Sequence, residues 1–129
     1  MRAVTMQPAA RTMSLPAFLL RLEGLTVFVA AVALYASQQG NAWLFALLLL
    51  APDVSALGYA ASPRVGATTY NMVHTIIFPA VLMALSLAAG VPALGQVALI
   101  VFAHIGMDRM MGYGLKYPTA FKDTHLGRV

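Results

Sequence analysis

The sequence predicts an all-α membrane protein: a four-helix transmembrane bundle with both termini cytoplasmic and a short ordered C-terminal extension. Three observations predict it. Hydrophobic residues make up 60% of the chain and charged residues only 9%, whereas charged residues make up about 25% of an ordinary soluble domain. The apolar residues form four runs, each close to the ~20 residues that cross about 30 Å of hydrocarbon. The basic residues lie only at those ends of the runs that would share one side of the membrane.

The four expected spans follow one another closely and cover residues 17–35, 42–60, 66–89 and 91–111. Trp43 stands near the start of the second span, where an indole anchors a helix at the membrane interface. Gly90 is a helix stop and Pro92 a first-turn residue, so they separate the third span from the fourth. The remaining residues form a polar basic N-terminal leader, 1–16, and a cytoplasmic C-terminal extension, 112–129.

The distribution of Lys and Arg predicts the orientation of the bundle. The connections after the first and third spans hold no basic residue. By the positive-inside rule, both termini and the loop after the second span therefore face the cytoplasm. The leader lacks the pattern of a cleaved secretory signal, so we expect the first span to be retained. The basic residues are Arg2, Arg11, Arg21, Arg64, Arg109, Lys116, Lys122 and Arg128.

Three acidic residues and two histidines lie inside the apolar runs, where an unpaired charge is costly and therefore indicates a functional site. Glu23, Asp53 and His74 lie in the first, second and third spans. His104 and Asp108 lie in the fourth, four residues apart and hence on one face of a helix. All are on the cytoplasmic side of their spans, so we expect one layer in which all four helices contribute a polar side chain.

Carboxylates and imidazoles on facing helices of a bundle are the oxygen and nitrogen ligands of zinc, manganese or iron. We therefore predict a divalent metal site, with Glu23 as a further ligand or general base. Asp53 follows Pro52, which lacks a backbone donor, so local unwinding is expected to expose carbonyls to the same cavity. The predicted ligands are Asp53, His74, His104 and Asp108.

A metal with an open coordination position lowers the pKa of bound water. The leading hypothesis is therefore a metal-dependent hydrolase acting on a membrane-associated ester or phosphoester, with a small molecule or a lipid as substrate. The alternative is a non-enzymatic membrane protein whose polar cluster is structural or supports a partner or an ion pathway. In that protein Arg109 would join a network of ion pairs and hydrogen bonds. Glu23 would pair with Arg21 or Arg109.

The C-terminal extension begins where Gly112 and Gly114 break the fourth helix. Its aromatic residues suit the headgroup level of a bilayer, and its basic residues can contact phosphate or simply set the topology. The second-rank candidates for substrate binding are Arg109, Lys116, Lys122 and His125. Nucleic acid is not an expected partner, because topology explains the basic residues and no soluble domain presents them. The expected partner is the lipid bilayer.

Four sequence blocks carry a resemblance that covers about residues 17–128. Three of them are Leu22-Glu-Gly-Leu, Ala51-Pro-Asp-Val-Ser-Ala-Leu-Gly-Tyr and Gly66-Ala-Thr-Thr-Tyr-Asn-Met-Val-His-Thr. The fourth begins with Ala103-His-Ile-Gly-Met-Asp-Arg. In these blocks the chain resembles a family of small bacterial integral membrane proteins catalogued as domain of unknown function 4260. The resemblance implies a multi-pass protein of the bacterial inner (cytoplasmic) membrane and implies no activity.

A weaker similarity is to the inner-membrane metal-dependent hydrolases, which have a Pro-Asp-x-Asp block, a block with two histidines and a His-x-x-x-Asp block in that order. Asp53, His74 and the pair His104 and Asp108 fall on matching places. Ser55 and Thr69 stand where two further ligands of that family would be. This similarity implies a shared four-helix scaffold more than it implies retained hydrolysis.

Overall fold

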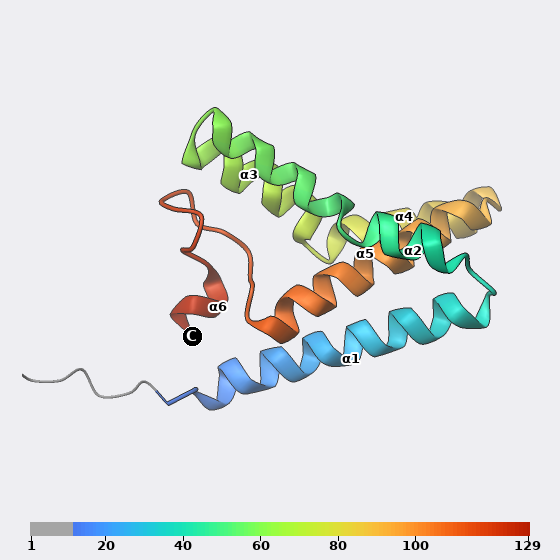
Figure 1. Cartoon of the computed structure of the whole chain (residues 1–129), viewed down its shortest axis with the longest axis horizontal. Coiled ribbons are helices and arrows are strands. Elements are labelled where there is room, and N and C mark those ends of the chain that lie inside the picture. Colours follow the sequence, from blue (N-terminus) through green and yellow to red (C-terminus); the bar gives the residue numbers. More distant parts are fainter. Residues whose placement is uncertain (1–11) are drawn as a thin grey trace, which may run out of the picture.

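The computed structural model describes residues 12–129, which fold into helices joined by short connections (Figure 1). No strand occurs in this range, where the only β feature is an isolated bridge between Lys116 and Thr124. The all-α prediction is therefore confirmed. Most of the predicted leader, residues 1–11, lies outside the described residues. The elements are α1 (Leu15–Ser37), α2 (Ala42–Leu49), the 3₁₀ helix η1 (Ala51–Ala60), α3 (Pro63–His74), α4 (Ile77–Ala89), α5 (Pro92–Met111) and α6 (His125–Arg128).

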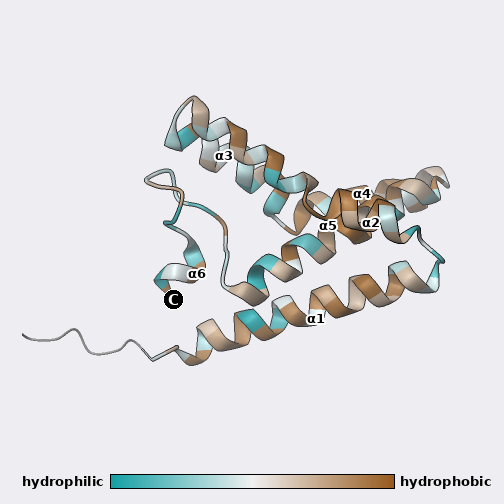
Figure 2. Ribbon diagram, in the orientation of Figure 1, coloured by the Kyte–Doolittle hydropathy of each residue, from teal (hydrophilic) through white to brown (hydrophobic). Residues whose placement is uncertain are grey.

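Three of these helical stretches are long and apolar enough to cross a membrane: α1, the continuous stretch Ala42–Ala60, and α5. A fourth span is added if α3 and α4, which are bent by 41° at a short break, count as one. The chain is therefore an α-helical protein with three or four candidate membrane spans, as expected of a membrane protein. Figure 2 shows strongly hydrophobic residues along the ribbon where α2, α4 and α5 meet, and more polar residues towards α3 and the C-terminal segment.

The antiparallel helices α1 and α5 pack closely against each other through two glycines. A Cβ atom placed on Gly24 would be 2.5 Å from Cβ of Arg109, and one placed on Gly106 would be 2.6 Å from the backbone nitrogen of Phe28. Small residues allow membrane helices to approach this closely, and van der Waals packing and weak hydrogen bonds then hold them together. This contact fixes the position of α5 along α1, and α5 carries His104 and Asp108.

We expect Gly106→Ala to destabilise the protein by about 1–3 kcal/mol, the usual effect of overpacking a tight contact. The added methyl group would meet backbone atoms, which cannot rotate away as a flexible side chain can. The matched control is Gly127→Ala, because a Cβ there lies 3.5 Å from its nearest neighbour, an ordinary contact. Thermal unfolding in detergent measures both variants, and equal midpoints would contradict the packing described here.

The second span changes from α to 3₁₀ geometry at Ala51, the residue before Pro52. The backbone N–H of Asp53 donates to the carbonyl of Leu50, three residues earlier, at 3.1 Å. The carbonyl of Leu49, which would accept this bond in a continuous α-helix, is left available. The prediction that Pro52 unwinds the helix and exposes a carbonyl to the polar cavity agrees with this geometry, because Leu49 accepts a bond from the site described below.

The third span, predicted as one helix over 66–89, is broken between α3 and α4. Thr75 has φ −80° and ψ 142°, an extended conformation between the two helices. Pro79, buried in the first turn of α4, explains the break. Its ring cannot donate to the carbonyl of Thr75 and would clash with it in a continuous helix. The break lets α3 end at His74 in the interior of the bundle.

The C-terminal extension is ordered and folds back against η1 and α3 (Figure 1). The Asn71 side chain exchanges two hydrogen bonds of 2.7 Å with the backbone of Lys116. The ring of Phe121 packs edge-on against Tyr59. Within the extension, Arg128 donates two hydrogen bonds to Asp123, and this guanidinium lowers the pKa of the Asp123 carboxyl to about 2. The prediction of a short ordered extension is confirmed.

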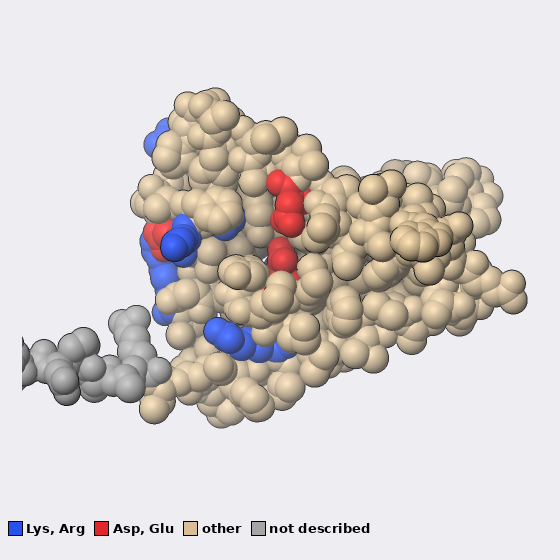
Figure 3. Space-filling view, viewed as in Figure 1, with Lys and Arg blue, Asp and Glu red and all other residues tan. Residues whose placement is uncertain are grey.

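The basic side chains visible in Figure 3 lie at the end of the molecule that holds the start of α1, the start of α3 and the C-terminal segment. The opposite half of this face shows no Lys or Arg. This distribution follows from the topology, since the described basic residues occupy the first half of α1, the first turn of α3, the last turn of α5 and the extension. That this end faces the cytoplasm stays a prediction.

Candidate metal centre

Three helical elements bring four ionisable side chains to one point in the bundle. Asp53 comes from the first turn of η1, His74 from the last residue of α3, and His104 and Asp108 from one face of α5. One ligand atom from each lies within 4.8 Å of the other three. The structure therefore assembles all four predicted metal ligands, which could hold a metal ion.

Five of the six distances between the four ligand atoms are close to those of tetrahedral coordination, and the two carboxylate oxygens lie within 4.8 Å of each other. His104 Nε2 lies 3.1 Å from His74 Nε2, 3.2 Å from Asp108 Oδ2 and 3.4 Å from Asp53 Oδ1. His74 Nε2 lies 3.4 Å from Asp53 Oδ1 and 3.7 Å from Asp108 Oδ2. Ligand atoms bound tetrahedrally about 2.0–2.1 Å from a zinc ion are about 3.3 Å apart. The three longer separations, of 3.4, 3.4 and 3.7 Å, exceed the usual 2.7–3.2 Å of a hydrogen bond.

Hydrogen bonds on the far side of both imidazoles fix the ring nitrogens that face the cluster. His74 Nδ1 donates to the carbonyl of Tyr70 at 2.7 Å, and His104 Nδ1 donates to the carbonyl of Leu49 at 2.6 Å. A carbonyl can only accept, so each neutral ring carries its proton on Nδ1 and directs an Nε2 lone pair into the cluster. Backbone carbonyls hold metal-ligating histidines in the same way.

Four acceptor atoms thus face one another: two imidazole lone pairs and two carboxylate oxygens. A proton bound between two of these atoms would form a hydrogen bond for that pair alone, across 3.1 Å or more, and would leave the other two acceptors without a donor. A single divalent cation would neutralise both carboxylates and bind both imidazoles. The donor set of two nitrogens and two oxygens fits zinc, manganese or iron.

Tyr70 supports this cluster, although the sequence did not identify it as a functional residue. Its ring stacks on that of His74 with 3.5 Å between centroids, and its hydroxyl donates to Asp108 Oδ2 at 3.3 Å. The spacing of four residues between Tyr70 and His74 places both on one face of α3. That spacing could have indicated from the sequence that Tyr70 lies beside His74, but an aromatic residue at such a position usually only packs in the core.

The cluster is buried on the histidine side and open on the side of Asp53. His74 and His104 are 4% and 0% exposed, whereas the Asp53 side chain is 52% exposed. Asp53 and Asp108 line a pocket of about 390 Å³, together with Leu50, Ala56, Tyr70, Met107, Met111, Tyr113, Lys116 and Phe121. A small substrate can therefore reach the carboxylates from this side.

Lys116 places a positive charge on the wall of this pocket. Its side chain is buried, donates to the carbonyl of Phe121 at 2.7 Å and lies 4.5 Å from the centre of the Tyr70 ring. Burial lowers the pKa of the Lys116 ammonium, and the negative charges of Asp108 and Asp53 oppose this shift. Lys116, a second-rank candidate from the sequence, is therefore next to the metal ligands.

The other predicted site residues lie outside the four-residue cluster. Glu23 lines a separate pocket between α1 and α5, and Arg109 lines both that pocket and a small one beside His74 and Asp108. Lys122 is exposed on the extension. His125 Nδ1 accepts from the backbone N–H of Leu115 at 2.8 Å, and burial, with a smaller effect of the Arg109 charge, lowers the pKa of this imidazole. Among the described residues, no lysine or arginine forms an ion pair with the cluster.

The fold and the cluster define a class: a small helical membrane protein with a candidate His₂Asp₂ metal centre. A comparison with protein-family models identifies the family of this chain. Residues 17–129 match the model of the domain of unknown function (DUF4260), and the chain belongs to this family. Searches of curated proteins and of solved structures gave no match. None of these comparisons shows the weaker similarity to inner-membrane metal-dependent hydrolases.

Proposed function

We propose that the protein is a metal-dependent hydrolase that acts on a membrane-associated ester or phosphoester. The observation that carries the proposal is the convergence of two imidazole nitrogens and two carboxylate oxygens within 4.8 Å of one another beside an open pocket. We further propose that it resides in the bacterial inner membrane, with its basic end in the cytoplasm, following the positive-inside rule.

The arrangement of the pocket supports hydrolysis. A divalent zinc, manganese or iron ion held by Asp53, His74, His104 and Asp108 would supply Lewis acidity and lower the pKa of bound water. Asp53 Oδ1 faces the cluster, and the half-exposed carboxylate leaves Oδ2 to accept a proton from a water molecule in the pocket. Lys116 would orient an anionic substrate, because its ammonium lies on the same pocket wall.

Glu23 is not part of this arrangement as proposed, although the sequence suggested it as a ligand or general base. It lines a different pocket, so hydrolysis is assigned here to the four clustered residues and Lys116. Arg109 lines the same separate pocket as Glu23. Its role as a substrate contact is likewise not needed for the chemistry proposed at the cluster.

One observation favours a second candidate function. Four protein ligands at tetrahedral separations are typical of structural metal sites, whereas catalytic zinc sites keep a coordination position open. A metal bound by all four side chains would tie η1, α3 and α5 together and stabilise a non-enzymatic membrane protein that supports a partner or an ion pathway. The half-exposed Asp53 is the ligand whose displacement would open a position for catalysis.

The two functions are separated by assaying the detergent-purified protein after chelation and after reloading with zinc, manganese or iron. Chromogenic carboxylic esters, phosphomonoesters and phosphodiesters serve as substrates. The hydrolase proposal predicts turnover of one class, lost on chelation and in Asp53→Ala and restored by one metal. A chain that binds metal and loses thermal stability on chelation, but turns over no substrate, would favour the structural site.

A further inference from the structure

Glu23 is an exposed carboxylate on a helix whose other exposed residues are mainly apolar. It lies on α1, and its neighbours Leu19, Leu22 and Leu25 are 48%, 41% and 39% exposed. α1 is one of the candidate membrane spans, and most of its surface faces away from the rest of the bundle. A charge on the lipid-facing side of such a helix is costly unless a partner satisfies it. The position therefore requires a partner for Glu23.

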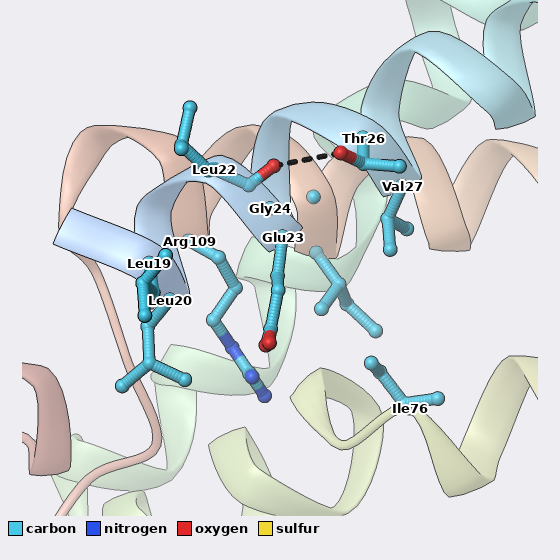
Figure 4. Close-up of a pocket in the computed structure, with 11 residues that line it drawn as sticks. Leu19, Leu20, Leu22, Glu23, Gly24, Thr26, Val27, Ile76 and Arg109 are labelled. Carbon is cyan, nitrogen blue, oxygen red and sulfur yellow. Dashed lines mark hydrogen bonds between the residues drawn. The ribbon is translucent and has the colours of Figure 1, made fainter. Parts of the chain in front are cut away.

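Arg109 points into the same pocket as Glu23, from the last turn of α5 (Figure 4). The pocket has a volume of about 500 Å³ and opens on the side of the bundle between α1, α5 and the break before α4. Its other lining residues are mainly apolar: Leu19, Leu20, Leu22, Gly24, Thr26, Val27, Ile76, Ile105 and Gly106. An anion and a cation thus share one apolar pocket at the protein surface.

Neither group makes a direct polar contact within residues 12–129, although the two charges are near enough to attract each other. The Glu23 carboxylate and the Arg109 guanidinium take part in no ion pair within 4.0 Å and in no side-chain hydrogen bond of the described structure. The one hydrogen bond drawn in the pocket joins Thr26 Oγ1 to the carbonyl of Leu22 on its own helix. The pocket therefore offers one free acceptor group and one free donor group to a ligand.

We propose that this pocket binds a zwitterionic phospholipid that carries a primary ammonium group. The Arg109 guanidinium matches a phosphate through two parallel hydrogen bonds. The Glu23 carboxylate accepts from the ammonium group, and the leucines of α1 contact an acyl chain. Arg109 lies in the last turn of α5, close to the level at which that helix leaves the membrane, where phosphate groups are available.

Charge complementarity selects this lipid over others. The two protein charges sum to zero, so a zwitterion satisfies both, whereas an anionic lipid would set its phosphate beside Glu23 without a second partner. A quaternary ammonium headgroup has no N–H to donate to the carboxylate. The predicted order of binding is phosphatidylethanolamine, then phosphatidylcholine, then phosphatidylglycerol.

Native mass spectrometry of the full chain, titrated with each of these three lipids, tests the proposal. We expect about tenfold tighter binding of phosphatidylethanolamine than of phosphatidylglycerol, which corresponds to one charge-assisted hydrogen bond. Glu23→Gln should remove this preference, and Arg109→Gln should weaken the binding of all three lipids. The control is Arg64→Gln, which removes a positive charge from the first turn of α3, outside the pocket.

Three results would overturn the proposal. One is equal binding of the three lipids by the wild type; another is unchanged binding in both pocket variants. The third is the signature of a direct ion pair: each single variant destabilises the protein, the double variant does not, and no lipid is retained. A loss of metal in Glu23→Gln would instead assign Glu23 to the metal cluster. None of these readouts depends on hydrolysis, so the lipid site and the proposed function fail separately.

Discussion

Replacing His104 by alanine is expected to lower the affinity of the chain for its divalent metal by more than about 100-fold. Loss of groups that merely support a ligand typically costs 10- to 100-fold, and His104 is itself a ligand in the proposed centre. Its Nε2 lies within 3.4 Å of the ligand atoms of the other three residues. The side chain is also fully buried, so the substitution leaves a cavity and an unpaired Leu49 carbonyl.

Competition with a chromophoric chelator measures this loss, and His125→Ala is the matched control. His125 is the same residue type, but it lies on the extension and contacts Leu115 rather than the cluster. We expect the control to retain the affinity of the wild type. Equal metal affinity in His104→Ala and in the wild type would remove His104 from the centre. A parallel loss in both variants would indicate general misfolding.

Replacing Lys116 by methionine is expected to lower kcat/KM for a phosphodiester by about 10- to 100-fold. This loss corresponds to one hydrogen bond to a charged group, about 1.5–3 kcal/mol. Methionine keeps most of the volume of the buried side chain but removes the ammonium group on the wall of the pocket. If Lys116 binds the substrate equally in the ground state and the transition state, KM should rise and kcat should stay unchanged.

Lys122→Met is the matched control, because Lys122 is exposed on the same extension and does not line the pocket. A neutral carboxylic ester assayed beside the phosphodiester identifies the substrate class. Loss of phosphodiester turnover alone assigns an anionic substrate to the pocket. Equal losses for both substrates would show that Lys116 supports the shape of the pocket rather than its charge.

The four clustered residues were predictable because each lies in an apolar run, where an ionisable side chain is rare and usually has a partner or a function. Their depths along the expected spans placed Asp53, His74, His104 and Asp108 in one layer, and the structure joins them. The spacing of four residues between His104 and Asp108 placed both on one face of α5. The unwinding at Pro52 followed from the missing backbone donor alone.

Other features depend on tertiary contacts that no pattern in the sequence contains. Depth alone placed Glu23 in the same layer, but the rotation of α1 about its axis, set by the Gly24 and Gly106 contact, directs it into another pocket. Tyr70 resembles an ordinary packing residue until its hydroxyl is seen beside Asp108. The break at Thr75 was missed because the apolar run continues through it, although Pro79 was the available signal.

Elemental analysis of the detergent-purified wild-type protein, before and after dialysis against zinc, manganese or iron, tests the central claim most directly. The geometry of the four ligand atoms predicts about one divalent transition-metal ion per chain, removable by a strong chelator. A chain that holds no metal, even after each ion has been supplied, would contradict the metal centre and with it the proposed hydrolysis.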